Sequence, residues 1–280
     1  MKVAVVNDCA HVFEDMLPLL QKQFEIQCIS RSRHFWDKTV KLAWQIARSN
    51  ADLYHVNYAL QDAFLVSKLR HLGILHVHGS DLRATLKTKR LGWLVKKNLR
   101  NAERVLYATP DLKEAIANYR DDAVYLPTPI DTDKFSPKTD YAEKPKALYF
   151  VLPYESVFPF EPFGKDYSYE LSLVQKRFAV TIAHKHVEYI DMPNYLKNFD
   201  VFVDRFSIPS RSKTCLEAMS CGLGVLNPSC SIDDFIEQIE TLRSSDLRKV
   251  GEENREFIIQ HHAAGLVANK LADIWREVAS

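Results

Sequence analysis

Short apolar runs alternate with amphipathic stretches through the first half of this chain. The runs are rich in β-branched residues and predict strands at residues 2–6, 25–29, 53–56, 74–77, 104–107 and 123–126. The stretches between them, such as 12–23, 36–48 and 59–70, carry apolar residues at helical spacing. Strands that alternate with helices form a parallel sheet with helices on both faces, because the crossovers are right-handed. We therefore expect a Rossmann-like α/β domain here.

The length of 280 residues suggests two domains, since domains of roughly 100–150 residues are commonest. A polar, proline-bearing stretch at residues 136–146 is the expected linker. We assign residues 1–140 to an N-terminal domain and residues 141–280 to a C-terminal one. The second half again predicts strands, at residues 147–152, 178–183 and 201–204, and ends in helices at 231–241, 246–260 and 264–279.

The stretch at residues 205–226, RFSIPSRSKTCLEAMSCGLGVL, carries the clearest chemical signal. It predicts a strand end, a loop, a helix that begins near Lys213, a glycine and another strand. The first backbone N–H groups of a helix have no intrahelical partner and attract phosphates. With Arg211 and Lys213 beside them, these groups would suit a diphosphate. Glu217, about one turn further on, is placed to accept hydrogen bonds from a ribose diol.

A purely structural explanation of the same residues stays open at this point. Thr214 and Glu217 have the spacing of a capping box, in which two residues satisfy each other's backbone N–H groups. Ser212 is an equally suitable N-cap. The spacing alone does not separate a ribose contact by Glu217 from a capping role.

The segment TCLEAMSCGLGVL resembles the signature of retaining GT-B glycosyltransferases of the family-four type. The resemblance implies a GT-B fold, with two Rossmann-like domains whose parallel sheets face each other across a cleft. It also implies sugar transfer from a nucleotide-diphosphate donor with retention of configuration and no obligatory metal, so we expect no cofactor. In that family the glutamate of this segment binds the donor ribose, and the loop before it binds the diphosphate. The corresponding donor-site residues here are Ser210, Arg211, Ser212, Lys213, Thr214 and Glu217.

Two of the chain's departures from the family pattern concern the contacts with the donor sugar and its diphosphate. Pro209 stands where a first glutamate, eight residues before the second, normally contacts the sugar. After the strand at residues 147–152 the family has an arginine and a lysine that neutralise the diphosphate. This chain has PYESVFPFEPFGKD, in which only Lys165 is available to stand for that lysine, so Lys165 is a further candidate for binding the donor. Because an unneutralised diphosphate in a closed site is costly, we expect Arg211 and Lys213 to supply the missing charge.

Loops at the carboxyl ends of parallel strands gather ligands, so the first half also offers candidates. His78 follows the strand at residues 74–77, and the resemblance makes it the histidine that contacts the donor sugar near the reacting centre. It is our candidate catalytic residue. Asp8 and His11 follow the first strand and are candidates for contacts with an acceptor. Asp81 either orients an acceptor hydroxyl or caps the next helix, and packing or capping is the alternative for the others.

Residues 86–104, LKTKRLGWLVKKNLRNAER, predict a basic amphipathic helix. Its cations are Lys87, Lys89, Arg90, Lys96, Lys97, Arg100 and Arg104. Such a helix can lie on an anionic membrane surface, which would suit a lipid-linked acceptor. It can equally cover the sheet with its apolar side and leave its lysines in water.

Composition excludes several classes of partner. The formal net charge of +1 gives no overall attraction for nucleic acid, so we expect no nucleic-acid partner. His184 and His186 could pair on a strand, but no third ligand accompanies them, so we expect no metal. The five cysteines have no zinc or redox spacing, and no run predicts a signal peptide or a membrane span. We expect a cytoplasmic protein, with a peripheral position on the inner face of the membrane as the alternative.

The expected function is transfer of a sugar from a nucleotide-diphosphate donor to a glycan or lipid-linked acceptor. The alternative is a catalytically silent homologue that binds a nucleotide-sugar or a partner protein, which Pro209 and the missing arginine favour. A sugar-nucleotide epimerase of the same fold is a second alternative, and the Glu-Ala-Met segment argues against it.

Overall fold

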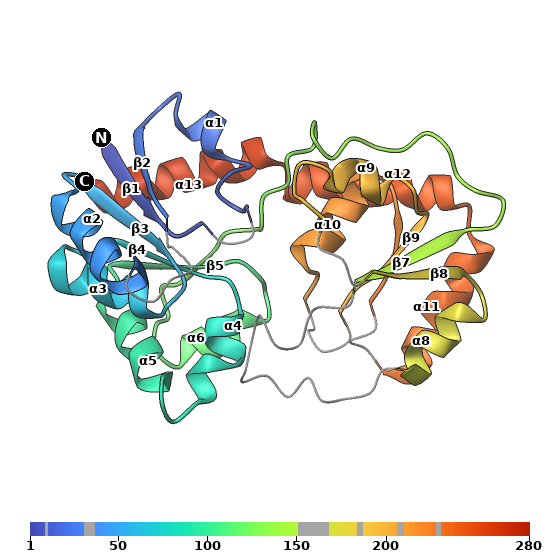
Figure 1. The fold of residues 1–280 in the computed structure, drawn as a ribbon, viewed down its shortest axis with the longest axis horizontal. Helices are drawn as coiled ribbons and strands as arrows, with labels where there is room; N and C mark the ends of the chain where they lie inside the picture. The colour runs from blue at the N-terminus through green and yellow to red at the C-terminus, as the bar shows by residue number, and fades with distance from the viewer. Residues whose placement is uncertain (9–10, 31–36, 151–167, 184–186, 206–209, 228–230) are drawn as a thin grey trace. The chain divides into compact units, whose positions relative to one another are not determined.

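The structure is a computed structural model that describes residues 1–8, 11–30, 37–150, 168–183, 187–205, 210–227 and 231–280. It divides into two compact units (Figure 1). The first comprises Met1–Pro129 and Ala264–Ser280, and the second comprises Ile130–Ala263. The boundary therefore falls before the linker expected around residue 140. The last helix, at the end of the second half of the sequence, belongs to the first unit because its buried face packs there.

The first unit contains a parallel sheet with the order β2-β1-β3-β4-β5-β6 in the described part of the chain. Its strands are β1 (Lys2–Val6), β2 (Glu25–Ile29), β3 (Leu53–Asn57), β4 (Ile74–Val77), β5 (Arg104–Tyr107) and β6 (Val124–Tyr125). Its helices are α1 (Leu17–Leu20), α2 (Leu42–Arg48), α3 (Gln61–Leu69), α4 (Ser80–Arg83), α5 (Gly92–Asn101), α6 (Leu112–Ala117) and α13 (Ala264–Ala279). A π-helical turn, Asp37–Lys41, precedes α2, and a 3₁₀ turn, Thr85–Lys87, follows α4.

Both faces of this sheet are buried, as the alternation of strands and helices predicts. Val3 and Val5 of β1 lie in a core with α1 and α13, whereas Ala4 and Val6 lie in a core with α2, α3, α5 and α6. The two sets separate because successive side chains of a strand point to opposite faces. Trp275 of α13 is completely buried in the first of these cores.

Two predicted helices of the first unit are shorter in the structure. In the region 12–23 only α1 is helical. Before it, residues 11–16 form turns, and Asp8 accepts hydrogen bonds there from the backbone N of Phe13 and Glu14. In the region 86–104 the helix begins at Gly92 and β5 already begins at Arg104. A Cβ on Gly92 would lie 2.4 Å from the carbonyl oxygen of Leu86, so the chain folds back tightly there.

The second unit contains a parallel sheet with the order β10-β9-β7-β8, again in the described part of the chain. Its strands are β7 (Lys146–Phe150), β8 (Ala179–Ala183), β9 (Val201–Val203) and β10 (Gly224–Leu226). Its helices are α8 (Ser168–Gln175), α9 (Met192–Leu196), α10 (Lys213–Ser220), α11 (Ile232–Ser244) and α12 (Leu247–His261). α10 begins at the residue that the sequence predicts. Leu148 of β7 and Ala147 beside it point into separate cores, so this sheet is also covered on both faces.

Candidate functional site

The N-terminus of α10 is where the sequence predicts the donor site. Ser212 is the N-cap of this helix, and its Oγ accepts a hydrogen bond from the backbone N of Cys215 at 3.0 Å. The backbone N of Ser212 donates to Oδ2 of Asp204, just after β9, at 2.9 Å. Ser212 rather than Thr214 therefore caps the helix. Two N–H groups that could have met a diphosphate are bonded within the protein, which the sequence did not reveal.

Lys213 and Glu217 form an ion pair on α10. Nζ of Lys213 lies 2.8 Å from Oε1 of Glu217, one turn further on. Their side chains are only 10% and 4% exposed, so each charge depends on the other for compensation. Glu217 thus presents a carboxylate that is already paired, and the charge of Lys213 is partly offset before any ligand arrives. A ligand at this site would meet the pair rather than two independent charges.

Tyr189 and Lys134 belong to the same group of side chains, although no sequence pattern singled them out. Nζ of Lys213 lies 2.7 Å from Oη of Tyr189, and Nζ of Lys134 lies 3.4 Å from the centre of the Tyr189 ring. The negative face of an aromatic ring favours a cation in this position. Lys134 therefore adds a second ammonium group near the start of α10. Residues 134, 189 and 213 are joined only by the fold, so no motif could have found them.

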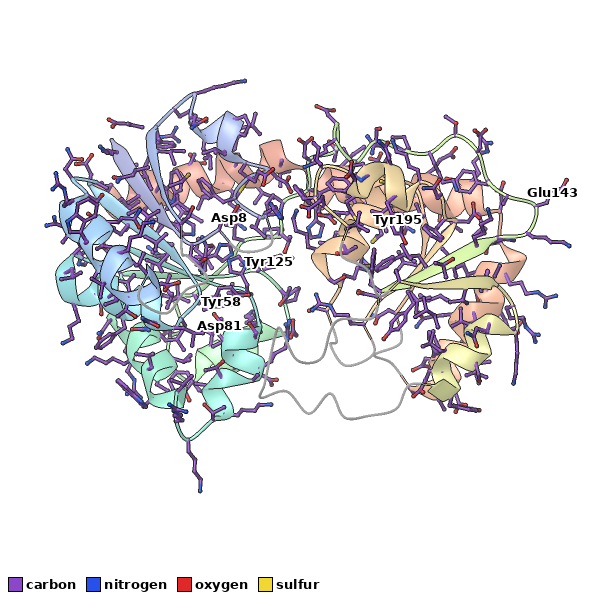
Figure 2. All side chains as sticks on the ribbon, viewed as in Figure 1. Asp8, Tyr58, Asp81, Tyr125, Glu143 and Tyr195 are labelled. Carbon is purple, nitrogen blue, oxygen red and sulfur yellow. The ribbon has the colours of Figure 1, made fainter. Side chains whose placement is uncertain are left out.

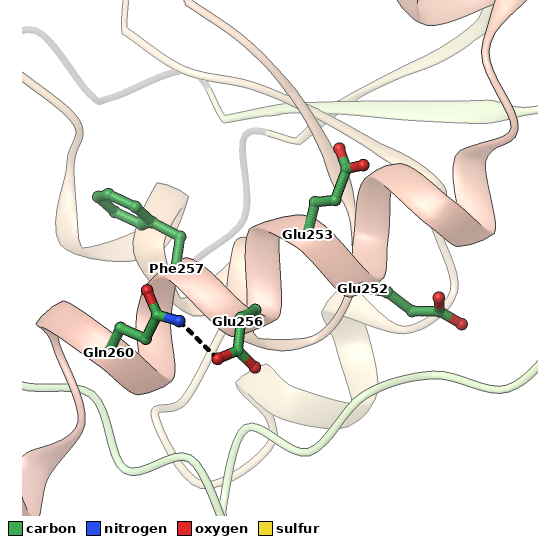
Figure 3. A pocket seen from close by; sticks show the side chains of 5 residues that line it. All are labelled: Glu252, Glu253, Glu256, Phe257 and Gln260. Atoms are coloured by element: carbon green, nitrogen blue, oxygen red, sulfur yellow. Dashed lines mark hydrogen bonds between the residues drawn. The ribbon is translucent and has the colours of Figure 1, made fainter.

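Arg211 is exposed, and its guanidinium carbon lies 4.9 Å from the centre of the Phe257 ring. Phe257 also lines a shallow pocket on α12. The other residues of that pocket are Glu252, Glu253, Glu256 and Gln260 (Figure 3). Three carboxylates would repel a diphosphate, so this pocket does not suit the donor.

Several predicted site residues add little to the description of the candidate site. Ser210 and Thr214 are half-buried in the loop and first turn at α10. Lys165, Pro209 and the pair His184 and His186 lie outside the described residues, and the role given to Lys165 stays a prediction. Within the residues that the structure does describe, no group of three or more histidine, cysteine, aspartate or glutamate side chains is arranged to hold a metal ion.

Three neighbouring strands of the first unit are followed by unusual backbone conformations. The φ angle is 61° at Asn7 after β1, 74° at Tyr58 after β3 and 127° at Gly79 shortly after β4. A positive φ is strained for a bulky residue such as tyrosine, and strain of this kind concentrates at functional sites. Figure 2 shows Asp8, Tyr58 and Asp81 near this end of the sheet. The carboxyl edge of the strands is therefore the candidate site of the first unit.

His78 lies at this edge and is half-buried. Its Nε2 lies 2.9 Å from Oδ1 of Asn57, the last residue of β3. Its ring centre lies 4.2 Å from that of His76 and 5.6 Å from that of Tyr58. Burial lowers the pKa of His78 to about 4, so the imidazole is neutral at pH 7. A neutral imidazole donates from one nitrogen and accepts at the other, which suits a sugar hydroxyl.

Two more histidines extend from His78 into the core of the first unit. His55 and His76 are each 1% exposed, and their ring centres are 5.6 Å apart. Burial, together with the neighbouring histidines, lowers the pKa of His55 to about 3 and the pKa of His76 well below its usual range. Nε1 of Trp275 donates to Nδ1 of His55 at 3.1 Å. The alternation of strand residues puts His76 and His78 on one side, but it did not predict that His55 and Trp275 extend this imidazole stack from the sheet edge to α13.

Asp81 binds backbone N–H groups and does not face solvent. It is completely buried and accepts hydrogen bonds from the backbone N of Ala59, Gly79 and Leu82 at 3.0–3.1 Å. Burial raises its pKa, and the three backbone donors act in the opposite direction. A carboxylate engaged in this way ties the loop after β3 to the loop after β4. We therefore leave Asp81 out of the acceptor site that we propose below.

Asp8 and His11 lie on the loop after β1. Asp8 accepts from the backbone N of Phe13 at 2.8 Å and of Glu14 at 3.1 Å. Nδ1 of His11 lies 2.6 Å from Oε2 of Glu14, and both side chains are about half exposed. Asp8 thus organises its own loop, and both residues stay candidates for acceptor contacts.

The basic segment both covers the sheet and presents cations to solvent. α5 buries Leu94, Val95 and Leu99, whereas Lys96 is exposed and Trp93 is 55% exposed. Arg104 lies in β5 and pairs with Glu277 of α13. Packing of this helix on the sheet is therefore compatible with contact between its lysines and an anionic membrane surface. Within the described residues, no helix has the length and apolarity needed to cross a bilayer.

Comparison with known proteins identifies the fold. No protein-family model matches the sequence, and no curated protein is similar to it. A sucrose-phosphate synthase from Thermosynechococcus elongatus aligns with a TM-score of 0.68 and 14% identity, over 99% of each chain. A variant of S. aureus TarM in a complex that contains UDP aligns with a TM-score of 0.58 and 12% identity, over 87% of this chain and 59% of that one. A putative UDP-N-acetylglucosamine 2-epimerase from Listeria monocytogenes aligns with a TM-score of 0.56 and 14% identity, over 97% and 94%.

These likenesses, at low identity, concern the fold alone. The structural neighbours include GT-B glycosyltransferases, and their two Rossmann-like parts match the two parallel sheets of this chain over nearly its whole length. This chain has the GT-B fold, as the sequence predicted.

Proposed function

We propose that this chain is a glycosyltransferase that moves a sugar from a nucleotide-diphosphate donor to an acceptor, with retention and without a metal. The observation that carries the proposal is α10, which begins at the predicted residue of a GT-B fold and bears the Lys213–Glu217 pair. Lys134, held at the Tyr189 ring, adds positive charge to the same unit. Cations near the start of a helix stabilise a departing diphosphate, which is where charge develops during transfer.

In this proposal the first unit contacts the transferred sugar and binds the acceptor. His78 contacts the transferred sugar as a neutral imidazole, and Asp8 and His11 contact the acceptor. Glu217 accepts a hydrogen bond from the ribose while its carboxylate stays balanced by Lys213. The acceptor is a glycan or a lipid-linked sugar, and the protein acts in the cytoplasm, with a peripheral position on the membrane if the acceptor is lipid-linked.

Two measurements on the full chain test this function. Calorimetry with UDP, GDP and ADP is expected to show binding of at least one of them. Incubation of the matching radiolabelled nucleotide-sugar with a lipid and glycan extract is then expected to move label into the extract. If no nucleoside diphosphate binds, the proposed function is wrong.

A silent homologue is the second candidate, and two contacts favour it. Glu217 is already paired with Lys213, and the backbone N of Ser212 is already bonded to Asp204. Both contacts use groups that a donor would need. A silent homologue that binds a nucleotide-sugar would bind a nucleoside diphosphate in calorimetry without any transfer of label, and one that binds a partner protein would bind none, so the two measurements together separate the candidates.

Membrane binding through the basic segment is a prediction of its own. Exchange of Lys89 and Lys96, which are both exposed, for glutamate should weaken binding to vesicles that contain phosphatidylserine. Each lysine near an anionic surface contributes about 1 kcal/mol, so the loss is expected to be roughly 30-fold or more in a flotation assay. The control is the same exchange at Lys176 and Lys249, which are exposed in the second unit. Equal flotation of both variants would contradict this surface.

A further inference from the structure

Asn57 determines how His78 uses its two ring nitrogens. Asn57 is 2% exposed, and its Nδ2 faces the carbonyl oxygen of Val6 at 3.5 Å. A carbonyl oxygen only accepts hydrogen bonds, so the amide nitrogen of Asn57 must lie on that side and the amide oxygen on the other. That oxygen lies 2.9 Å from Nε2 of His78 and also only accepts. Nε2 of His78 must therefore carry a proton.

The other ring nitrogen of His78 is consequently an acceptor. In a neutral imidazole with a proton on Nε2, Nδ1 has a lone pair and no proton. Among the residues that the structure describes, none donates to Nδ1, and this nitrogen is not one of the fully buried atoms that lack a partner. It is therefore accessible to a ligand at the carboxyl edge of the sheet.

In the described part of the chain, the rings that contact His78 carry no positive charge, and the guanidinium of Arg83, which lies against Gly79, is paired with Asp111. The rings that contact His78 are those of His76 on β4 and Tyr58 after β3, and His55 on β3 lies beyond His76. Burial keeps the pKa of His55 and His76 below neutral pH, so these two histidines are uncharged as well. Asp81, the buried carboxylate of the adjoining loop, is bonded to backbone N–H groups. A phosphate or carboxylate would therefore meet neutral rings and a guanidinium that is already balanced by a carboxylate.

We infer that Asn57 is a positioning residue that holds His78 with Nδ1 as an acceptor, so that the ligand group docking there is a hydroxyl donor rather than a phosphate or carboxylate. Tyr58, whose strained backbone directly follows Asn57, lines the same position. The proton on Nε2 follows from the geometry of Asn57, and the lone pair on Nδ1 follows from the neutral charge of the buried imidazole. The identification of the hydroxyl as that of a sugar rests on the proposed transferase function.

Nitrogen-15 NMR of the histidines in the full chain tests the assignment. At pH 7 the wild-type protein should show a hydrogen-bonded Nε2–H proton for His78 and an Nδ1 shift typical of an unprotonated nitrogen. Asn57→Ala should lose the Nε2–H signal, because the proton then exchanges with water. Asn98→Ala is the matched control, since Asn98 is a buried asparagine of the same unit that binds the carbonyls of Ala59 and Leu60. This control should keep the signal.

Asn57→Asp is the second variant, in case Asn57→Ala does not fold. The carboxylate still accepts from Nε2 and adds a negative charge, so the pKa of His78 should rise and both ring N–H signals should be seen at a higher pH than in the wild type. The assignment is overturned by an Nδ1–H signal in the wild type. It is also overturned if neither exchange at Asn57 alters His78.

Two probes test the ligand class. Methyl α-D-glucopyranoside should shift the Nδ1 resonance of His78 in the wild type and leave it unchanged in Asn57→Ala, whereas inorganic phosphate at the same concentration should not shift it. A shift with phosphate, or none with the glucoside, overturns the hydroxyl-donor ligand. Failure of the proposed transferase function gives a different result. In that case no nucleoside diphosphate binds in calorimetry, while the His78 signals are those described above.

Discussion

Replacement of Glu217 by alanine is expected to lower the free energy of unfolding of the second unit by about 3–5 kcal/mol, because it leaves the buried ammonium group of Lys213 without its carboxylate. The two side chains are only 4% and 10% exposed, so water cannot compensate for the missing partner. The same change should abolish nucleoside diphosphate binding, since Glu217 is the proposed ribose contact. Urea denaturation followed by far-ultraviolet circular dichroism measures the first effect, and calorimetry measures the second.

A double variant separates the two effects. Removal of both charges in Lys213→Leu with Glu217→Leu should recover most of the stability, since replacing a buried pair by apolar residues is often neutral. Binding should stay lost in the double variant, because neither charged group is present. A double variant as unstable as Glu217→Ala would show that packing, not charge, explains the loss.

The position of the tryptophans lets the two units be followed separately. Trp44, Trp93 and Trp275 lie in the described part of the first unit, and the sequence has no tryptophan within residues 130–263. Tryptophan fluorescence therefore reports unfolding of the first unit, whereas circular dichroism reports both. Glu217→Ala should move the circular dichroism transition to lower urea. Its fluorescence transition should change much less.

Acidification from pH 7 to pH 5 is expected to destabilise the first unit by about 2 kcal/mol for each of its buried histidines, since one pKa unit corresponds to about 1.4 kcal/mol. The pKa is about 3 for His55, about 4 for His78 and well below the usual range for His76. Unfolded histidines titrate near pH 6.5, so the unfolded chain takes up protons first as the pH falls. The contribution of the neutral histidines to the free energy of unfolding is thus complete above about pH 6.5. It is lost as the pH falls toward their pKa values in the folded protein.

The variant His76→Phe tests this explanation. It removes one titrating group from the stack, so the difference in unfolding free energy between pH 7 and pH 5 should shrink by about 2 kcal/mol. Asp81 acts in the opposite direction, because its pKa is raised by burial and its protonation at low pH favours the folded state. Since Asp81 is present in both proteins, the comparison isolates the histidine. An unchanged pH dependence, measured by urea denaturation with tryptophan fluorescence, would rule out the stack as its cause.

The secondary structure was largely predictable because short-range patterns specify it. The strands at residues 2–6, 25–29, 74–77 and 104–107 and the helix at residues 264–279 have the same bounds in the structure. Helix lengths were predicted less well where the chain makes local contacts, as at Gly92 and after Asp8. The periodicity of apolar residues indicates a helix but carries no information about where turns interrupt it. Here one turn comes from the close approach of a carbonyl oxygen, and another comes with a carboxylate that binds backbone N–H groups.

The candidate site was predictable only in part. The sequence pointed to α10 and its glutamate, and it pointed to His78, because each is preceded by a strand and lies in a recognisable local pattern. It did not predict Lys134 at Tyr189, or Asn57 at His78, since the members of each pair are distant in the chain. It also left two roles open for Asp81, an acceptor contact or a cap, and the structure shows this residue buried and bonded to three backbone N–H groups.

The sequence by itself determined that this protein has two parallel α/β sheets and a helix that begins at Lys213, because alternating patterns and capping residues act over a few positions. Only the tertiary structure decided the charge and protonation of the site residues. Glu217 is balanced by Lys213 because both are buried together, and His78 is neutral because it is buried beside the histidines of β3 and β4, one of which binds Trp275 of α13. Burial and partners at long sequence separation set these properties, and they exist only once the chain has folded.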